Sequence, residues 1–344
     1  MPSHVRTLVV LALAALLLGL FLRNVDVRSV LGEIARARPG WLLLSLSTMF
    51  ANLAVRAWRW QYLLEPLGHP SFRMAFKATA VGFAASSILP ARAGEVIRPY
   101  FLARQEGISA TGAFATVILE RLLDMLTVLA LLAAYVFVFG RDMGAVNPVA
   151  FAAVKWAGVT AAVAALGALV VLFVVAGDPA RLRRGLIRLE QVLPSTLAGL
   201  LARIAEKFAI GLGAVRRPSR LFVALALSLP LWLCIGLGIW AGARAFHLAV
   251  PFTGSFLLQA LLVIGVAVPT PGAVGGFHEA YRVGVTVFFG APNDAAIGSA
   301  IVVHAFSVVP ALLLGLLFAA QAGLNVTGMR QLASQSDPGK AAQP

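Results

Sequence analysis

Two segments of this chain place carboxylate and guanidinium groups beside prolines and glycines within otherwise apolar sequence. The first, residues 86–98, carries Arg92, Glu95 and Arg98. An arginine fork can hold a phosphate through two parallel hydrogen bonds, so Arg92 and Arg98 are candidates for clamping one. If a helix restarts near Ala93, Glu95 lies in its first turn, where the helix dipole favours an anion. Alternatively, the arginines pair with Glu95 and only stabilise the local hairpin.

The second segment, residues 268–282, places His278, Glu279 and Arg282 after the run Pro-Thr-Pro-Gly-Ala-Val-Gly-Gly. A histidine titrates near neutral pH, so His278 could carry a proton or donate a hydrogen bond to a headgroup. The glycine-rich run lacks a following Lys-Ser/Thr pair and is not a nucleotide loop. No His or Cys pair has the spacing of metal ligands, so we expect neither a metal nor another cofactor.

A third charged group, Glu120, Arg121 and Asp124, interrupts the apolar stretch 113–139. Glu120 and Asp124 are four residues apart and therefore share one face of a helix. Ionisable side chains at membrane depth must face a bundle interior or a wet cavity. The group is either a proton-coupled site or a buried structural network, and the sequence leaves both interpretations open.

The apolar stretch 40–64 carries the ring-rich run 58–62 together with two arginines. We interpret this run as an interfacial aromatic belt, in which Arg56 and Arg59 extend toward the membrane surface. The alternative places Arg56 in a cavity, because Asn52 lies four residues earlier on the same helical face.

Composition identifies the elements that must position these residues. Of 344 residues, 60% are hydrophobic and 12% are charged, about half the ~25% charged fraction of soluble proteins. Many apolar runs exceed about 18 residues, which predicts membrane-spanning helices; they are continuous rather than alternating, which excludes a β-barrel. The net charge of +14 resides mainly in loops, which indicates positive-inside orientation and anionic lipid headgroups rather than nucleic acid.

Six stretches are apolar throughout and two are broken by proline and glycine. We expect full spans at residues 5–22, 40–64, 113–139, 150–176, 221–246 and 295–321, and broken segments at 72–104 and 255–290. The arginine-rich connector 181–220 marks the cytoplasmic face, and we interpret the first span as a retained helix with a cytoplasmic N-terminus. The broken segments must then be re-entrant hairpins that enter from opposite faces.

The chain is predicted to form one domain, residues 1–330, with halves at about 40–176 and 221–321 and a disordered tail at 331–344. Residues 107–118 align weakly with 290–301, and each stretch follows a break and leads into a long helix. The predicted orientations of the halves are opposite, which is typical of an inverted repeat, with chance similarity as the alternative. The predicted fold is an all-α polytopic membrane helix bundle with two re-entrant hairpins and inverted-repeat pseudo-symmetry.

Four motifs resemble the lysylphosphatidylglycerol synthase transmembrane-region family, also called flippase-like or UPF0104 proteins. They are Asn52…Arg56-Ala-Trp-Arg-Trp60, Leu89-Pro-Ala-Arg-Ala-Gly-Glu-Val-Ile-Arg98, Leu119-Glu-Arg-Leu-Leu-Asp124 and Pro269-Thr-Pro-Gly-Ala-Val-Gly-Gly-Phe-His-Glu279. The resemblance implies lipid movement across the bilayer. The best understood relatives carry aminoacylated phosphatidylglycerol to the outer leaflet and have a soluble aminoacyltransferase domain after the membrane part. This chain ends about 20 residues after its last predicted span, so we do not expect synthase chemistry.

We therefore expect an integral membrane lipid transporter, or flippase, for a lipid with an anionic or phosphate-bearing headgroup. Its substrate class is phospholipid or aminoacyl-phospholipid. Polyprenyl-phosphate or lipid-linked glycan handling is the alternative, as is a non-catalytic partner of a lipid-modifying enzyme. A membrane-embedded transferase is the enzyme alternative, but we find no metal motif or nucleophile–base pair and expect no enzyme activity.

We expect multiple passes through a bacterial cytoplasmic (inner) membrane, with both termini in the cytoplasm. Homo-oligomerisation and binding to a lipid-synthesis enzyme stay open. Basic groups would hold the phosphate, and the acids would balance charge or bind a cationic headgroup moiety. The candidate substrate-binding residues are Asn52, Arg56, Arg92, Glu95, Arg98, Glu120, Arg121, Asp124, His278, Glu279 and Arg282.

Overall fold

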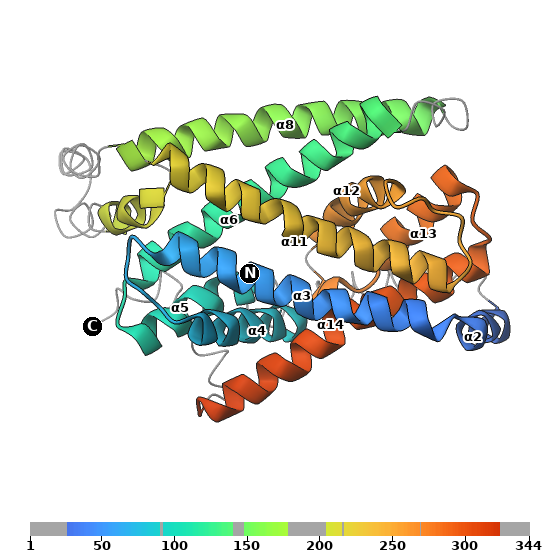
Figure 1. The fold of residues 1–344 in the computed structure, drawn as a ribbon, viewed down its shortest axis with the longest axis horizontal. Helices are drawn as coiled ribbons and strands as arrows, with labels where there is room; N and C mark the ends of the chain where they lie inside the picture. Colours follow the sequence, from blue (N-terminus) through green and yellow to red (C-terminus); the bar gives the residue numbers. More distant parts are fainter. Residues whose placement is uncertain are drawn as a thin grey trace, which may run out of the picture.

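The computed structural model describes residues 26–89, 92–139, 148–177, 204–214, 217–268 and 270–323, and these form helices and no strand (Figure 1). The predicted span 5–22, most of the connector 181–220 and the tail 331–344 lie outside the described residues. The elements are α2 (Val27–Arg36), α3 (Pro39–Leu64), α4 (Phe72–Ile88), α5 (Gly94–Glu106), α6 (Ala110–Ala134), the π-helical η2 (Tyr135–Phe139), α8 (Pro148–Gly177), η4 (Leu212–Ala214), α11 (Pro218–Ala245), α12 (Gly254–Ala267), η5 (Pro271–Ala273), α13 (Gly276–Phe289) and α14 (Asn293–Gln321).

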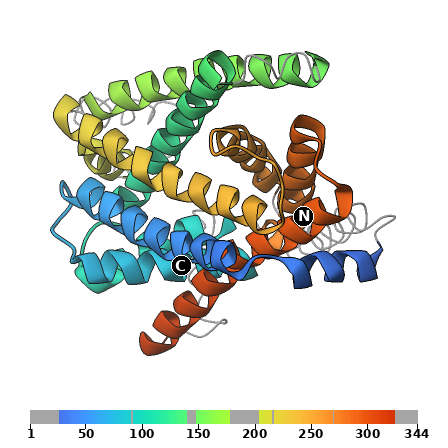
Figure 2. The ribbon, with the colours of Figure 1, turned by 45° about the vertical axis from the view of Figure 1, so that its right-hand side comes forward.

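Five helices of the described part are long and apolar enough to cross a membrane: α3, α6 with η2, α8, α11 and α14. They match five predicted spans to within a few residues, so the all-α membrane bundle is confirmed. Helix α8 carries Lys155 as its single charged residue and is otherwise almost entirely apolar, and only 6% of its most apolar stretch is buried. It lies along the outside of the bundle in both views (Figures 1 and 2). An apolar surface of this kind is stable against lipid.

Helices α3 and α11 run antiparallel through the middle of the molecule (Figure 1). Ser45 Oγ of α3 donates to the Gly238 carbonyl of α11 at 2.8 Å, and Arg59 Nη1 donates to Ser228 Oγ at 2.6 Å. From Ser45 to Arg59 the residue numbers on α3 rise, while those of their partners on α11 fall from 238 to 228. The two helices therefore pack antiparallel.

The two broken segments are helical hairpins, each closed by a pair of glycines. A β-carbon on Gly94, the first residue of α5, would lie 1.8 Å from the Gly82 carbonyl oxygen of α4. A β-carbon on Gly276, the first residue of α13, would lie 2.2 Å from the Gly265 carbonyl oxygen of α12. Backbones approach this closely only where both partners lack a side chain.

The two hairpins also end alike. Helices α5 and α13 are terminated by Gly107 (φ 67°) and Gly290 (φ 63°), which adopt the left-handed conformation that glycine tolerates at a helix C-terminus. The next helix starts three residues later in each half, at Ala110 and at Asn293. These features support the alignment of the two halves. The pseudo-symmetry, and the membrane face from which each hairpin enters, stay predictions.

The second break packs against the last turn of α4, beside the first break. A β-carbon on Gly272 would lie 3.8 Å from the carbonyl oxygen of Ser87, in the last turn of α4. Arg92 in the first break (φ 55°) and Ala273 in the second (φ 59°) both adopt the left-handed region, which costs about 1–2 kcal/mol for a residue with a β-carbon. Strain of this kind concentrates at functional sites.

Candidate functional site

Three helices bring six charged side chains together inside the bundle. We call this set the arginine cluster: Arg56 and Arg59 from α3, Arg98 from α5, and Glu120, Arg121 and Asp124 from α6. All are buried except Arg121, whose side chain is 33% exposed. When all six are ionised, four guanidinium groups face two carboxylates. The cluster therefore holds an excess of two positive charges.

Asp124 is fixed by three donors. Arg59 Nη1 donates to its Oδ1 at 2.7 Å, and Arg56 Nη1 donates to its Oδ2 at 3.0 Å. The indole Nε1 of Trp232, from α11, donates to Oδ1 at 3.1 Å. The cluster is thereby attached to the second half of the chain as well as to the first.

Glu120 is fully buried and also accepts hydrogen bonds from three donors. It accepts from Arg98 Nη1 at 2.9 Å, from Arg59 Nη2 at 2.9 Å and from Arg56 Nη1 at 3.3 Å. The guanidinium of Arg98 also lies over the Trp60 ring, 3.8 Å from its centroid. Both carboxylates therefore pair with arginines of the cluster.

Several guanidinium nitrogens of the cluster are buried and find no hydrogen-bond partner within the described part of the chain. They are Nε of Arg56, Arg59, Arg98 and Arg121, and Nη2 of Arg98. Buried polar groups are almost always hydrogen-bonded to protein, water or ligand. Unpaired donors together with excess positive charge are the chemistry that favours an anion.

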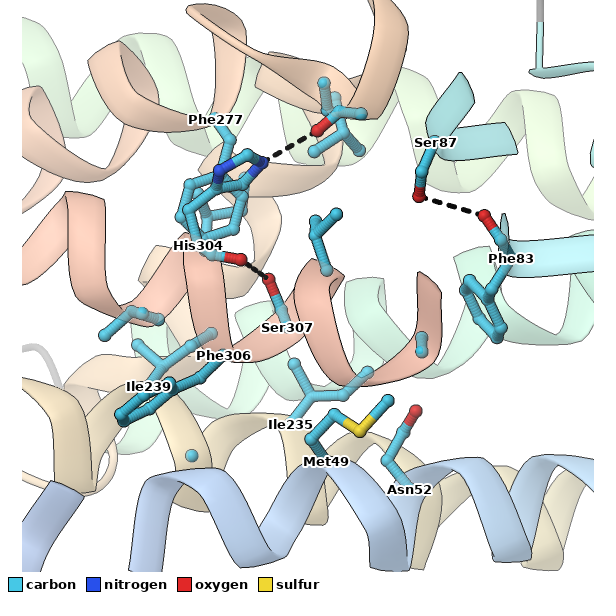
Figure 3. A pocket seen from close by; sticks show the side chains of 18 of the residues that line it. Met49, Asn52, Phe83, Ser87, Ile235, Ile239, Phe277, His304, Phe306 and Ser307 are labelled. Carbon is cyan, nitrogen blue, oxygen red and sulfur yellow. Dashed lines mark hydrogen bonds between the residues drawn. The ribbon is translucent and has the colours of Figure 1, made fainter. Parts of the chain in front are cut away.

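A cavity of about 340 Å³, which we call the central cavity, lies between α3, α4, α11, α12, α14 and the two breaks (Figure 3). Figure 3 shows that residues from separate helices surround it, including Asn52, Ser87 and Ser307. Most of the wall is apolar. The polar lining residues are Ser45, Thr48, Asn52, Arg56, Ser86, Ser87, Arg92, Gln259, Thr270, His304 and Ser307. The cavity reaches the arginine cluster at Arg56.

The first predicted charge group is divided by the structure. Arg92 Nη2 lies 3.1 Å from Glu95 Oε1, and their side chains are 48% and 31% exposed. Arg92 lines the central cavity, whereas Arg98 points into the buried arginine cluster. The predicted joint clamp of Arg92 and Arg98 on one phosphate therefore has no support in their positions. Glu95 does lie in the first turn of α5, as expected.

The second predicted charge group is divided as well. Arg282 Nε donates to Glu279 Oε2 at 2.9 Å on α13, and neither residue is among the described residues that line the cavity. His278 is buried, and its ring lies 4.5 Å from the ring of His304. His304 lines the cavity, and its Nε2 lies 2.7 Å from the Gly272 carbonyl oxygen.

Arg59 was missed as a site residue, and its assignment to an interfacial belt is wrong because the residue is 0% exposed. The helical spacing held the signal. Asn52, Arg56 and Arg59 recur at intervals of four and three residues, which places them on one face. Trp58 is 56% exposed and faces outward, so its place in an aromatic belt stays a prediction.

Gln259 was also missed, because one amide in an apolar helix carries no pattern. Metal binding finds no support within the described residues, where no three His, Cys, Asp or Glu side chains gather closely enough to hold an ion.

The long apolar helices define an integral membrane protein, and the buried charged cluster and the central cavity lie inside its helix bundle. The chain belongs to the Lysylphosphatidylglycerol synthase TM region family, which it matches over residues 7–315. A UPF0104 membrane protein of Methanocaldococcus jannaschii is 23% identical over 122 residues, which cover 35% of this chain and 36% of the relative. The match thus spans about a third of that relative. The resemblance that the four motifs indicated is confirmed.

Proposed function

We propose that this protein is a lipid transporter that moves a phosphate-bearing lipid headgroup between the leaflets of a membrane. The arginine cluster beside the central cavity carries this proposal. Excess buried charge and unpaired donors destabilise a fold unless an anion compensates them. Ionisable residues at membrane depth are also, by default, a sign of function. A lipid phosphate is an anion that reaches such a site from within the bilayer.

The cavity fits a headgroup rather than a whole lipid. Its volume of about 340 Å³ lies at the lower end of the ~300–1,000 Å³ typical of small-molecule pockets. In the proposed mechanism, Arg56 and Arg92 meet the phosphate, and the acyl chains stay in the surrounding hydrocarbon. Only the headgroup then needs a polar path.

The hairpins supply the moving parts of the proposed mechanism. Both breaks contribute to the cavity wall, the first through Arg92 and the second through Thr270 and Gly272. If the hairpins enter from opposite faces, rocking of one half against the other would open the cavity alternately to each leaflet. We place the protein in a bacterial cytoplasmic membrane with both termini inside.

The alternatives share part of this chemistry. A polyprenyl phosphate or lipid-linked glycan carries the same phosphate and would use the same arginines. A membrane transferase would need a nucleophile and a base in contact with the substrate. In our proposal the cavity binds and releases lipid without making or breaking a bond, alone or beside a lipid-synthesis enzyme.

Reconstitution into vesicles with fluorescent phosphatidylglycerol or a fluorescent polyprenyl phosphate tests the proposal. We expect wild type to translocate at least one of them, and Arg56→Gln to reduce that rate at least tenfold, because the guanidinium that lines the cavity is lost. Arg104→Gln removes an exposed arginine of α5 and should match wild type. Folded protein that translocates neither lipid would refute transport, and equal loss in both variants would refute the site.

A further inference from the structure

The central cavity has an unbalanced set of charged groups. Arg56 and Arg92 line it, and no carboxylate does so among the described residues. Glu120 is not a lining residue, and it accepts hydrogen bonds from three guanidinium groups. Glu95 pairs with Arg92 outside the lining. A cationic group on a ligand would therefore meet two guanidinium groups in the cavity and no carboxylate among the described lining residues.

One uncharged polar side chain of the wall is also unsatisfied. Gln259 of α12 is 1% exposed, lines the cavity, and has no hydrogen-bond partner in the described structure for either amide atom. An amide offers both a donor and an acceptor, which is what a hydroxyl needs. Burial of such a group without a partner costs about 1–3 kcal/mol, so a ligand that satisfies it gains affinity.

The amide lies against Gly236 of α11. A β-carbon on Gly236 would lie 2.5 Å from Gln259 Nε2, so a larger residue there would displace the end of the Gln259 side chain. Trp232 precedes Gly236 by one helical turn, lines the cavity and donates to Asp124 of the arginine cluster. The amide thus lies along the wall of the same cavity, about one turn, or ~5 Å along α11, beyond the part that reaches the cluster.

We propose that the central cavity selects an anionic phospholipid whose headgroup beyond the phosphate is uncharged and carries hydroxyl groups, as in phosphatidylglycerol. Arg56 binds the phosphate, and Gln259 determines specificity by hydrogen-bonding a headgroup hydroxyl. An aminoacylated headgroup is rejected because its ammonium would enter a cavity of excess positive charge. This substrate class rests on the proposed function, and it differs from the lipid in the name of the family.

Binding to the purified full chain in detergent micelles tests the selectivity. The probes are phosphatidylglycerol, phosphatidylpropanol and lysyl-phosphatidylglycerol; the first two carry the same charge and differ only in hydroxyls. We expect phosphatidylglycerol to bind three- to tenfold more tightly than phosphatidylpropanol, the effect of about one net hydrogen bond. Lysyl-phosphatidylglycerol should bind at least tenfold more weakly than phosphatidylglycerol.

Gln259→Leu tests the assigned residue. The exchange conserves volume and removes an unsatisfied buried amide, so we expect the protein to fold at least as well as wild type. Phosphatidylglycerol should then bind no more tightly than phosphatidylpropanol, whose own affinity should not change. Gln61→Leu is the matched control, since the Gln61 amide donates to the Pro70 carbonyl and does not line the cavity. It should leave the preference between the lipids intact.

Three results would overturn the inference: equal or tighter binding of lysyl-phosphatidylglycerol, an unchanged lipid preference in Gln259→Leu, or no binding of any probe. Its failure is separable from that of the transporter proposal. Vesicles that translocate lysyl-phosphatidylglycerol best would leave transport standing and refute the selectivity. Selective binding in micelles without translocation in vesicles would do the reverse.

Discussion

At the residue scale, each carboxylate of the arginine cluster accepts hydrogen bonds from more than one guanidinium group. Asp124 receives Arg56, Arg59 and Trp232, and Glu120 lies beside it on the same face of α6. Removal of one carboxylate would leave four guanidinium groups around a single acid. Buried charges without compensation are far more costly than exposed ones.

We therefore expect Asp124→Asn to destabilise the protein by about 3–5 kcal/mol, the usual cost of breaking a buried ion pair from one side. Thermal unfolding in detergent measures it as a lowered Tm. Glu95→Gln is the control, because its part-exposed pair with Arg92 contributes only about 0–1 kcal/mol. An Asp124→Asn protein with the Tm of wild type would show that the cluster is not structural.

The same residues show what the sequence could predict. The spacing of Glu120 and Asp124 placed both acids on one buried face, and the structure agrees. The separation of Arg92 from Arg98 was not predictable. Arg98 packs onto the ring of Trp60 in α3 and donates to Glu120 in α6, and the sequence around Arg98 does not show that these helices lie beside it. Local spacing determines a helical face; tertiary packing decides which charges meet across it.

At the element scale, the two hairpins depend on glycines at their crossing points. The breaks themselves were predictable, since proline and glycine interrupt an apolar run. The glycine pairs were not, because Gly82 and Gly265 lie in uninterrupted helix and only the fold shows what they face. Equivalent crossings in the two halves support the repeat independently of the weak sequence alignment.

Gly94→Ala should destabilise the first hairpin by at least ~3 kcal/mol, the upper end of the usual cost of overpacking, because the new methyl would lie 1.8 Å from a backbone oxygen. Gly276→Ala should have a similar effect on the second hairpin. Thermal unfolding of both variants in detergent checks the pair. Gly167→Ala in α8 is the control, since nothing lies within 4 Å of its β-carbon. Stability similar to wild type in only one hairpin variant would contradict their equivalence.

At the scale of the whole molecule, the exposed α8 encloses no part of the cavity, whereas both hairpins do. The site thus lies where the two halves of the chain meet, rather than within either one. The Asp124–Trp232 hydrogen bond and the packing of η5 against α4 both cross this boundary. A transport cycle that rocks the halves must alter contacts of this kind.

Cross-linking the two halves at the breaks should therefore stop transport without preventing lipid binding. Ser87→Cys with Gly272→Cys, in a Cys234→Ser background, places the new thiols across the boundary, because a β-carbon on Gly272 lies 3.8 Å from the Ser87 carbonyl oxygen. We expect a short bifunctional thiol reagent to reduce lipid translocation in vesicles at least tenfold. Each single-cysteine variant treated with the reagent should keep its untreated rate, which separates cross-linking from simple modification. A cross-linked double variant that translocates lipid at the untreated rate would show that the breaks do not move apart during transport, and that the headgroup crosses through a fixed path.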